Sequence, residues 1–84
     1  MKPNDIKEII KKSINVKHIF INSDDNIHFQ SIIVSDDFIN LSLINRQKKI
    51  NKILNDFFLS GQIHAFTLKT YTIEEWDKIK LKCF

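Results

Sequence analysis

The segment from Gly61 to Trp76 constrains the fold most, because it carries local signals for a helix end, a strand and a helix start. Gly61 is the only glycine, and glycine readily adopts the left-handed conformation that ends many helices. Residues 63–69 place β-branched and aromatic side chains at alternating positions, which predicts a short strand. Thr72 and Glu75 have the spacing of a capping box, and Tyr71 and Trp76 flank it as a hydrophobic staple does. The segment therefore predicts a helix end, a strand and a helix start, in that order.

The first third of the chain predicts a helix followed by a hairpin. Residues 4–14 place isoleucines at helical spacing, with lysines and a glutamate facing outward, and Asn15 is a plausible left-handed stop for this helix. Residues 17–21 and 28–34 are rich in β-branched and aromatic side chains. They flank a polar turn at residues 23–26, so we expect two paired strands.

The middle and the end of the chain predict three further helical segments. Ser35 is placed to cap a single turn at residues 36–38, and Ser42 to cap the longest helix, residues 43–59. A final helix is expected from residue 73 towards residue 80. The apolar side chains expected to face the core are Ile50, Ile53, Leu54, Phe57 and Phe58 in the long helix. In the final helix Trp76, Ile79 and Cys83 fall on one face, which would let Cys83 pack at the helix end.

This order of elements predicts an α+β fold, a three-stranded sheet covered on one face by helices. A chain of 84 residues is too short for a second hydrophobic core, so residues 1–84 are expected to form a single domain. No apolar run approaches the ~20 residues of a membrane span, so no membrane insertion is expected. Cys83 is the only cysteine, which is compatible with a reducing compartment, and we expect a cytoplasmic protein.

The residue pattern excludes the common enzyme motifs and a self-contained metal centre. One glycine cannot build a phosphate-binding loop, and no His-Glu-x-x-His or nucleophile elbow is present, so we expect no enzyme. One cysteine and three histidines supply at most part of the coordination shell of a structural zinc or an iron–sulfur cluster. If this chain binds a cluster, a partner must bring the thiolates. From pattern alone, His64 is either a histidine at the edge of the core or such a partial ligand.

Basic residues at the start of the long helix leave nucleic-acid binding as an alternative. The formal net charge is +3, and Arg46, Lys48, Lys49 and Lys52 follow the expected cap of this helix. Such residues contact phosphates in many nucleic-acid-binding proteins. However, KH-type recognition uses a GXXG loop, and this chain has none. A DNA-binding transcriptional regulator is therefore the alternative and not the favoured function.

Several segments of the chain resemble the BolA/IbaG family. Residues 63–76 are similar to the family segment IHALSLKTYTPEEW, and residues 35–42 to VSDAFEGKSRV. Residues 46–54 lie where the family has RHRLVxxxL, and residues 24–30 resemble the IbaG branch more closely than BolA itself. The resemblance implies a KH-like αββααβ fold with an extra C-terminal helix. Asn40 stands where the family has glycine, which Asn tolerates because it accepts left-handed geometry.

The resemblance also implies a function in iron–sulfur trafficking, iron homeostasis and stress response. Members of the family partner monothiol glutaredoxins and hold or relay a [2Fe–2S] cluster, with sulfur ligands from the glutaredoxin and from glutathione. The histidine of the family motif corresponds to His64, and a second ligand comes from the loop between the first two strands. Asp25 falls about where some relatives have cysteine, which leaves His28 as the nearby candidate. A homodimer of the free chain is also possible.

Overall fold

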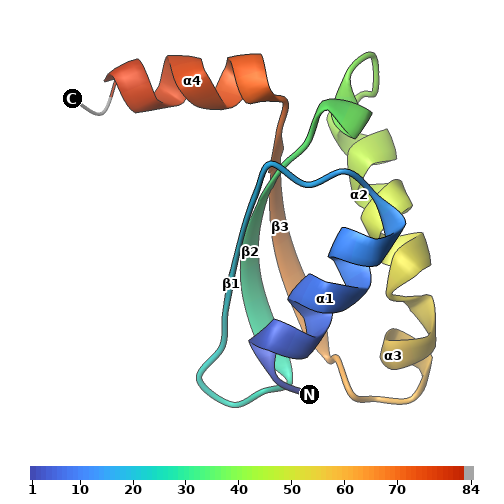
Figure 1. Cartoon of the computed structure of the whole chain (residues 1–84). Coiled ribbons are helices and arrows are strands. Elements are labelled where there is room, and N and C mark those ends of the chain that lie inside the picture. Colours follow the sequence, from blue (N-terminus) through green and yellow to red (C-terminus); the bar gives the residue numbers. More distant parts are fainter. Residues whose placement is uncertain (83–84) are drawn as a thin grey trace.

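The computed structural model describes the backbone of residues 1–82 and the side chains of residues 1–80. The elements in this part of the chain are α1 (Pro3–Ser13), β1 (His18–Asn22), β2 (His28–Val34), the 3-10 turn η1 (Asp36–Phe38), α2 (Leu43–Ile53), α3 (Asn55–Leu59), β3 (Ala65–Tyr71) and α4 (Ile73–Lys82) (Figure 1). The α+β class is confirmed. The final helix extends two residues beyond the expected end, and the expected packing of Cys83 lies outside the described residues.

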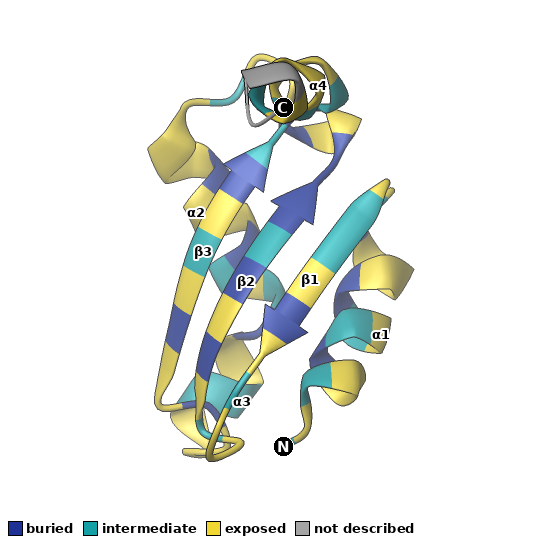
Figure 2. Ribbon diagram, turned by 90° about the vertical axis from the view of Figure 1, so that its left-hand side faces the viewer, coloured by how far each residue is buried: buried dark blue, intermediate teal, exposed yellow. Residues whose placement is uncertain are grey.

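The three strands form one mixed sheet in the order β1-β2-β3. β1 and β2 are antiparallel because a short polar turn joins them, whereas β2 and β3 are parallel because η1, α2 and α3 connect them. Helices α1 and α2 lie against one face of this sheet, and Figure 2 shows the opposite face turned towards the viewer. Helix α4 leaves the end of β3 and projects away from α1 and α2 (Figure 1). The sheet is therefore covered by α1 and α2 on one face, as expected.

The hydrophobic core lies between the sheet and these two helices. Its fully buried side chains include Ile6 and Ile10 from α1, Phe29 and Ile33 from β2, and Ile50 and Leu54 from the region of α2. Ile53, Phe57 and Phe58 pack against this cluster with part of their surface exposed. The expected apolar stripe of the long helix is confirmed, because all five of its residues contact the core.

The expected helix over residues 43–59 is interrupted, and this part of the prediction is wrong. Helix α2 ends at Ile53, Leu54 has φ −97° and ψ 5°, and the short helix α3 begins at Asn55. The break precedes Asn55 and Asp56. Asn and Asp are poor helix formers in the interior of a helix and are favoured at its start, which explains why a new helix begins here. The amide groups of Phe57 and Phe58 both donate to the Leu54 carbonyl, so a new turn begins at the break.

The sequence offers Asn4 or Asp5 as the cap of the first helix, but both lie inside α1, whose N-cap is Lys2. The caps expected at Ser35 and Ser42 are confirmed. Ser35 and Ser42 accept hydrogen bonds from the amide groups of Asp37 and Asn45. Helix α1 ends at Ser13, and Ile14 then turns into extended geometry and is buried, so Asn15 is not the left-handed stop. Left-handed backbone occurs instead at Asn26, Asn40 and Gly61, with φ values of 62°, 66° and 80°. Asn40 therefore adopts the left-handed geometry that was expected at this position.

The remaining expected boundaries lie within two residues of the observed ones. Helix α1 begins at Pro3, and the Asp5 carboxylate accepts the amide hydrogen of Lys2 at 3.1 Å from within the first turn. Strand β1 covers residues 18–22 and not 17–21, while β2 has the expected bounds. Among residues 1–82, no helix is long and apolar enough to cross a membrane.

Candidate metal-ligand site

The parallel pairing of β2 and β3 brings two histidines together at one end of the sheet. His28 is the first residue of β2, and its partner in the register is Ala65, the first residue of β3. His64 immediately precedes Ala65, so it lies beside His28 although the two are far apart in sequence. The ring centroids are 5.7 Å apart, and the ring planes meet at 83°. Both residues are exposed, which leaves the pair accessible to a partner.

Backbone hydrogen bonds hold the approach to β3 in place around His64. The amide group of His64 donates to the Ile27 carbonyl at 2.7 Å, and that of Ile63 donates to the Phe57 carbonyl at 3.1 Å. The strand predicted over residues 63–69 would begin at Ile63, and its alternation would put His64 on the same face as Phe66. The strand begins instead at Ala65, because the buried Ile63 side chain belongs to the loop and fills the core from there. The alternation is therefore broken before β3, and the His64 side chain faces solvent.

The turn between β1 and β2 supports His28 through Asp25. One oxygen of Asp25, Oδ1, accepts the amide hydrogens of His28 at 2.8 Å and Ile27 at 3.0 Å. The other oxygen, Oδ2, lies 2.7 Å from Nδ1 of the His28 ring. The hydrogen bond from the His28 amide, then those from the Ile27 amide and the His28 ring, hold the pKa of the Asp25 carboxyl well below its usual range. Asp25 is therefore ionised at neutral pH.

The site offers imidazole ligands but not a complete coordination shell. Neutral imidazole nitrogen is a good ligand for iron, and a pair of histidines can replace two thiolates on one iron of a [2Fe–2S] cluster. Within the described residues, no group of three or more His, Cys, Asp and Glu side chains is placed to hold a metal ion. An exposed pair of donors fits a cluster whose other ligands come from a second molecule.

Arg46 is not part of an exposed basic surface, and the expectation that it faces a nucleic acid is wrong. Arg46 is buried, and its Nη1 lies 2.7 Å from Oε1 of Glu75, with Nη2 at 3.3 Å from Oε2. Its Nε donates to the Leu41 carbonyl at 3.1 Å. The hydrogen bonds from Arg46, and then from the Thr72 amide, lower the pKa of Glu75. This arginine therefore joins α2 to the start of α4, and its donors are used within the fold.

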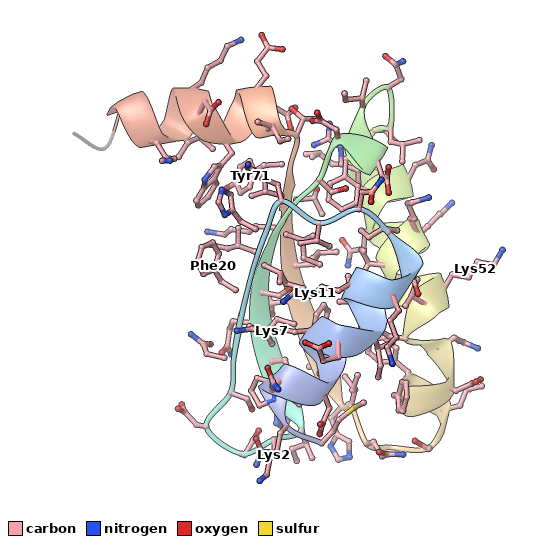
Figure 3. The ribbon with its side chains drawn as sticks, in the orientation of Figure 1. Lys2, Lys7, Lys11, Phe20, Lys52 and Tyr71 are labelled. Atoms are coloured by element: carbon pink, nitrogen blue, oxygen red, sulfur yellow. The ribbon has the colours of Figure 1, made fainter. Side chains whose placement is uncertain are left out.

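The three lysines of the nucleic-acid alternative are exposed on α2. Lys48, Lys49 and Lys52 have no salt bridge within the described part of the chain, and Figure 3 shows Lys52 pointing away from the molecule. Without Arg46, this surface lacks the only arginine of the sequence, which is the side chain best suited to bidentate phosphate contacts. Phosphate binding by the lysines stays a prediction.

An aromatic cluster that the sequence pattern did not predict lies on the face of the sheet that α1 and α2 leave free. The ring centroids of Phe20 and Trp76 are 6.0 Å apart, those of Tyr71 and Trp76 5.6 Å, and those of His18 and Trp76 6.2 Å. Figure 3 shows Phe20 on this side of the sheet, and Phe20 is 50% exposed. The shared strand face of His18 and Phe20 was visible in the sequence, but their contact with Trp76 depends on how α4 leaves β3.

Comparisons with known proteins agree with the fold. A family model described as BolA-like protein matches residues 2–75. A protein of Haemophilus influenzae is 38% identical to this chain over 87% of this chain and 85% of its own length. The acid stress protein IbaG of Escherichia coli strain K12 is 28% identical over 93% of this chain and 92% of its own.

A solved structure is similar over nearly the whole chain. The solution structure of yeast Fra2 has a TM-score of 0.74 and 31% sequence identity, and the match covers 98% of this chain and 90% of the Fra2 chain.

Proposed function

The chain belongs to the BolA-like protein family, and from this premise we propose that it partners a monothiol glutaredoxin in binding or relaying a [2Fe–2S] cluster. In this proposal the chain is not an enzyme, and the cluster is its cargo. His64 is the principal ligand that the chain contributes, and His28 is the second. The observation that carries the proposal is the contact between these two rings at the exposed end of β2 and β3, with centroids 5.7 Å apart.

The chemistry of the donor set supports a shared cluster. Iron–sulfur clusters are held mainly by thiolates, and the only cysteine of this chain is Cys83. The missing sulfur ligands would come from the glutaredoxin and from glutathione, as the family resemblance implies. The chain's own contribution is to hold two imidazoles side by side at the end of the sheet, where the Ile27 carbonyl accepts the backbone amide hydrogen of His64. Rigid placement lowers the entropy lost when a ligand and a metal ion meet.

We include a role in iron homeostasis and stress response in the proposal. IbaG, the similar protein of Escherichia coli, is named an acid stress protein. Closer kinship with the IbaG branch rests on residues 24–30, the segment that contains His28 and Asp25. His28, the second proposed ligand, lies in this segment. Kinship with the IbaG branch and the role of His28 as a ligand are therefore proposed together.

Reconstitution with a partner tests the proposed function. The chain is mixed with a monothiol glutaredoxin and glutathione, a cluster is assembled, and visible absorption and circular dichroism are recorded. We expect a heterodimer spectrum distinct from that of the glutaredoxin alone, and His64→Ala is expected to abolish the difference.

His18→Ala is the matched control, because His18 lies in the aromatic cluster and not beside His64. A heterodimer spectrum that His64→Ala leaves unchanged would remove His64 as a ligand. A heterodimer that forms without any cluster would instead make the chain an interaction module.

A further inference from the structure

We propose that Asp25 is a positioning residue that binds the Nδ1 hydrogen of His28 and so leaves Nε2 as the atom offered to iron beside His64. The inference deepens the proposed function and rests on it. Asp25 falls about where some relatives have a cysteine, as the family resemblance implies. In this chain its carboxylate instead orients the histidine three residues later.

The hydrogen bonds of Asp25 determine which ring nitrogen carries the hydrogen. The backbone amide groups of Ile27 and His28 both donate to Oδ1. Oδ1 therefore acts as an acceptor and carries no hydrogen. An ionised carboxylate is an acceptor at both oxygens, so the short contact between Oδ2 and Nδ1 requires a hydrogen on Nδ1. A neutral imidazole with its hydrogen on Nδ1 has its lone pair on Nε2. The other tautomer would place the Nδ1 lone pair against the carboxylate.

Hydrogen bonds within the turn hold Asp25 in place. The Ser23 hydroxyl oxygen accepts the amide hydrogens of Asn26 at 2.9 Å and Asp25 at 3.3 Å, and Asn26 is left-handed. The side chains of Asp25 and His28 are 46% and 53% exposed, so the ring would otherwise rotate freely. The carboxylate thus selects both the orientation and the tautomer of the His28 ring beside His64.

The same contacts argue against Asp25 as a direct ligand. Both of its oxygens are engaged with groups of its own loop: binding iron through Oδ1 would compete with two amide groups, and binding through Oδ2 would compete with the His28 ring. Carboxylate oxygen is also a poorer match than imidazole for iron in a sulfide-rich cluster. A carboxylate hydrogen-bonded to the remote nitrogen of a ligating histidine is a common arrangement in metalloproteins, and it raises the basicity of the ligand.

The tautomer is measured on the chain alone by NMR. The two ring nitrogens of His28 are recorded in a ¹⁵N-labelled sample at about pH 8, where a free imidazole is neutral. We expect the Nδ1–H form to predominate in the wild type.

The matched variants are Asp25→Asn and Asp24→Asn. In Asp25→Asn the amide oxygen can still accept from the turn, while its NH₂ group faces Nδ1, so we expect the Nε2–H form to predominate. Asp24→Asn removes the same charge from the neighbouring exposed residue, which accepts none of these bonds, and should resemble the wild type. The Ile27 and His64 amide signals report whether the turn is intact. A wild-type His28 mainly in the Nε2–H form, or an unchanged tautomer in Asp25→Asn, would overturn the proposal.

Zinc serves as a probe of the exposed nitrogen, with no glutaredoxin or cluster present. Titration of the chain with Zn²⁺ should shift the ring signals of His28 and His64 together, and His28→Ala should remove the effect. Asp25→Asn should weaken zinc binding by about tenfold, the lower end of the range for such supporting residues. Asp24→Asn should stay close to the wild type.

Equal zinc affinities of the two asparagine variants would overturn the positioning role. Both measurements use the chain alone, so their failure leaves the reconstitution result standing. A failed reconstitution in turn removes the proposed function without changing the tautomer result.

Discussion

Replacing Glu75 by glutamine should destabilise the fold by about 2 kcal/mol, because it breaks the ion pair with the buried Arg46. The guanidinium donates to both carboxylate oxygens, at 2.7 and 3.3 Å, whereas glutamine offers it one oxygen acceptor and no charge. Oε1 also accepts the Thr72 amide hydrogen at 2.8 Å as part of the capping box. Hydrogen bonds to charged groups contribute roughly 1.5–3 kcal/mol, and breaking a fully buried pair costs about 3–5 kcal/mol.

We expect Glu75→Gln to cost less than the roughly 3–5 kcal/mol of a fully buried ion pair, for two structural reasons. The Glu75 side chain is 46% exposed, so water can replace part of what is lost. Arg46 also keeps its hydrogen bond to the Leu41 carbonyl. In a domain of this size, about 2 kcal/mol corresponds to a fall in Tm of roughly 8–16 °C.

Urea unfolding measures this difference, with Trp76 fluorescence and far-ultraviolet circular dichroism as independent probes. Glu74→Gln is the matched control, because Glu74 is 81% exposed and only pairs with Lys78 at 3.4 Å, so its loss should cost less than about 0.5 kcal/mol. A double-mutant cycle with Arg46→Met isolates the coupling between the two side chains. If the two glutamine variants are equally stable, or if the cycle gives no coupling, the structural role assigned to Arg46 is wrong.

The pH dependence of the same variant supplies a second check. The folded-state pKa of Glu75 is lowered from an ordinary value of 4.5, so the ionised form is favoured in the native state. Its contribution to stability is therefore complete above the unfolded pKa and is lost as the pH falls through the folded one. The difference between wild type and Glu75→Gln should be largest near neutral pH and should shrink below about pH 4.

Two further substitutions test the local geometry. Ser35→Ala should cost about 1–2 kcal/mol in urea unfolding, because the buried hydroxyl donates to the Asn15 carbonyl and accepts the Asp37 amide hydrogen, and an unchanged midpoint would contradict this. Asn40→Ala should cost about 1 kcal/mol at φ 66°, whereas Asn40→Gly should be neutral or slightly stabilising; equal thermal midpoints for these two variants would argue against left-handed backbone at this position.

The two halves of the candidate site were predictable to different degrees. His64 was found through a local motif, but the strand pattern placed it on the same face as Phe66, and the structure turns it to solvent because Ile63 fills the core from the loop. His28 was nominated by elimination, and its contact with His64 depends on the register of two parallel strands. Asp25 was considered only as a substitute for a cysteine, since the contact between its carboxylate and the His28 ring depends on the conformation of the turn.

Sequence by itself determined the features that depend on neighbours within a few residues. The capping box of Thr72 and Glu75 and the caps at Ser35 and Ser42 formed as expected, because their hydrogen bonds span only two or three residues. Tertiary structure alone decided the role of Arg46. Its partner Glu75 lies 29 residues away, and helical spacing cannot distinguish an exposed arginine from one that meets a distant carboxylate. The pairing of His28 with His64 has the same origin, because the crossover from β2 to β3 brings together residues that have no local interaction.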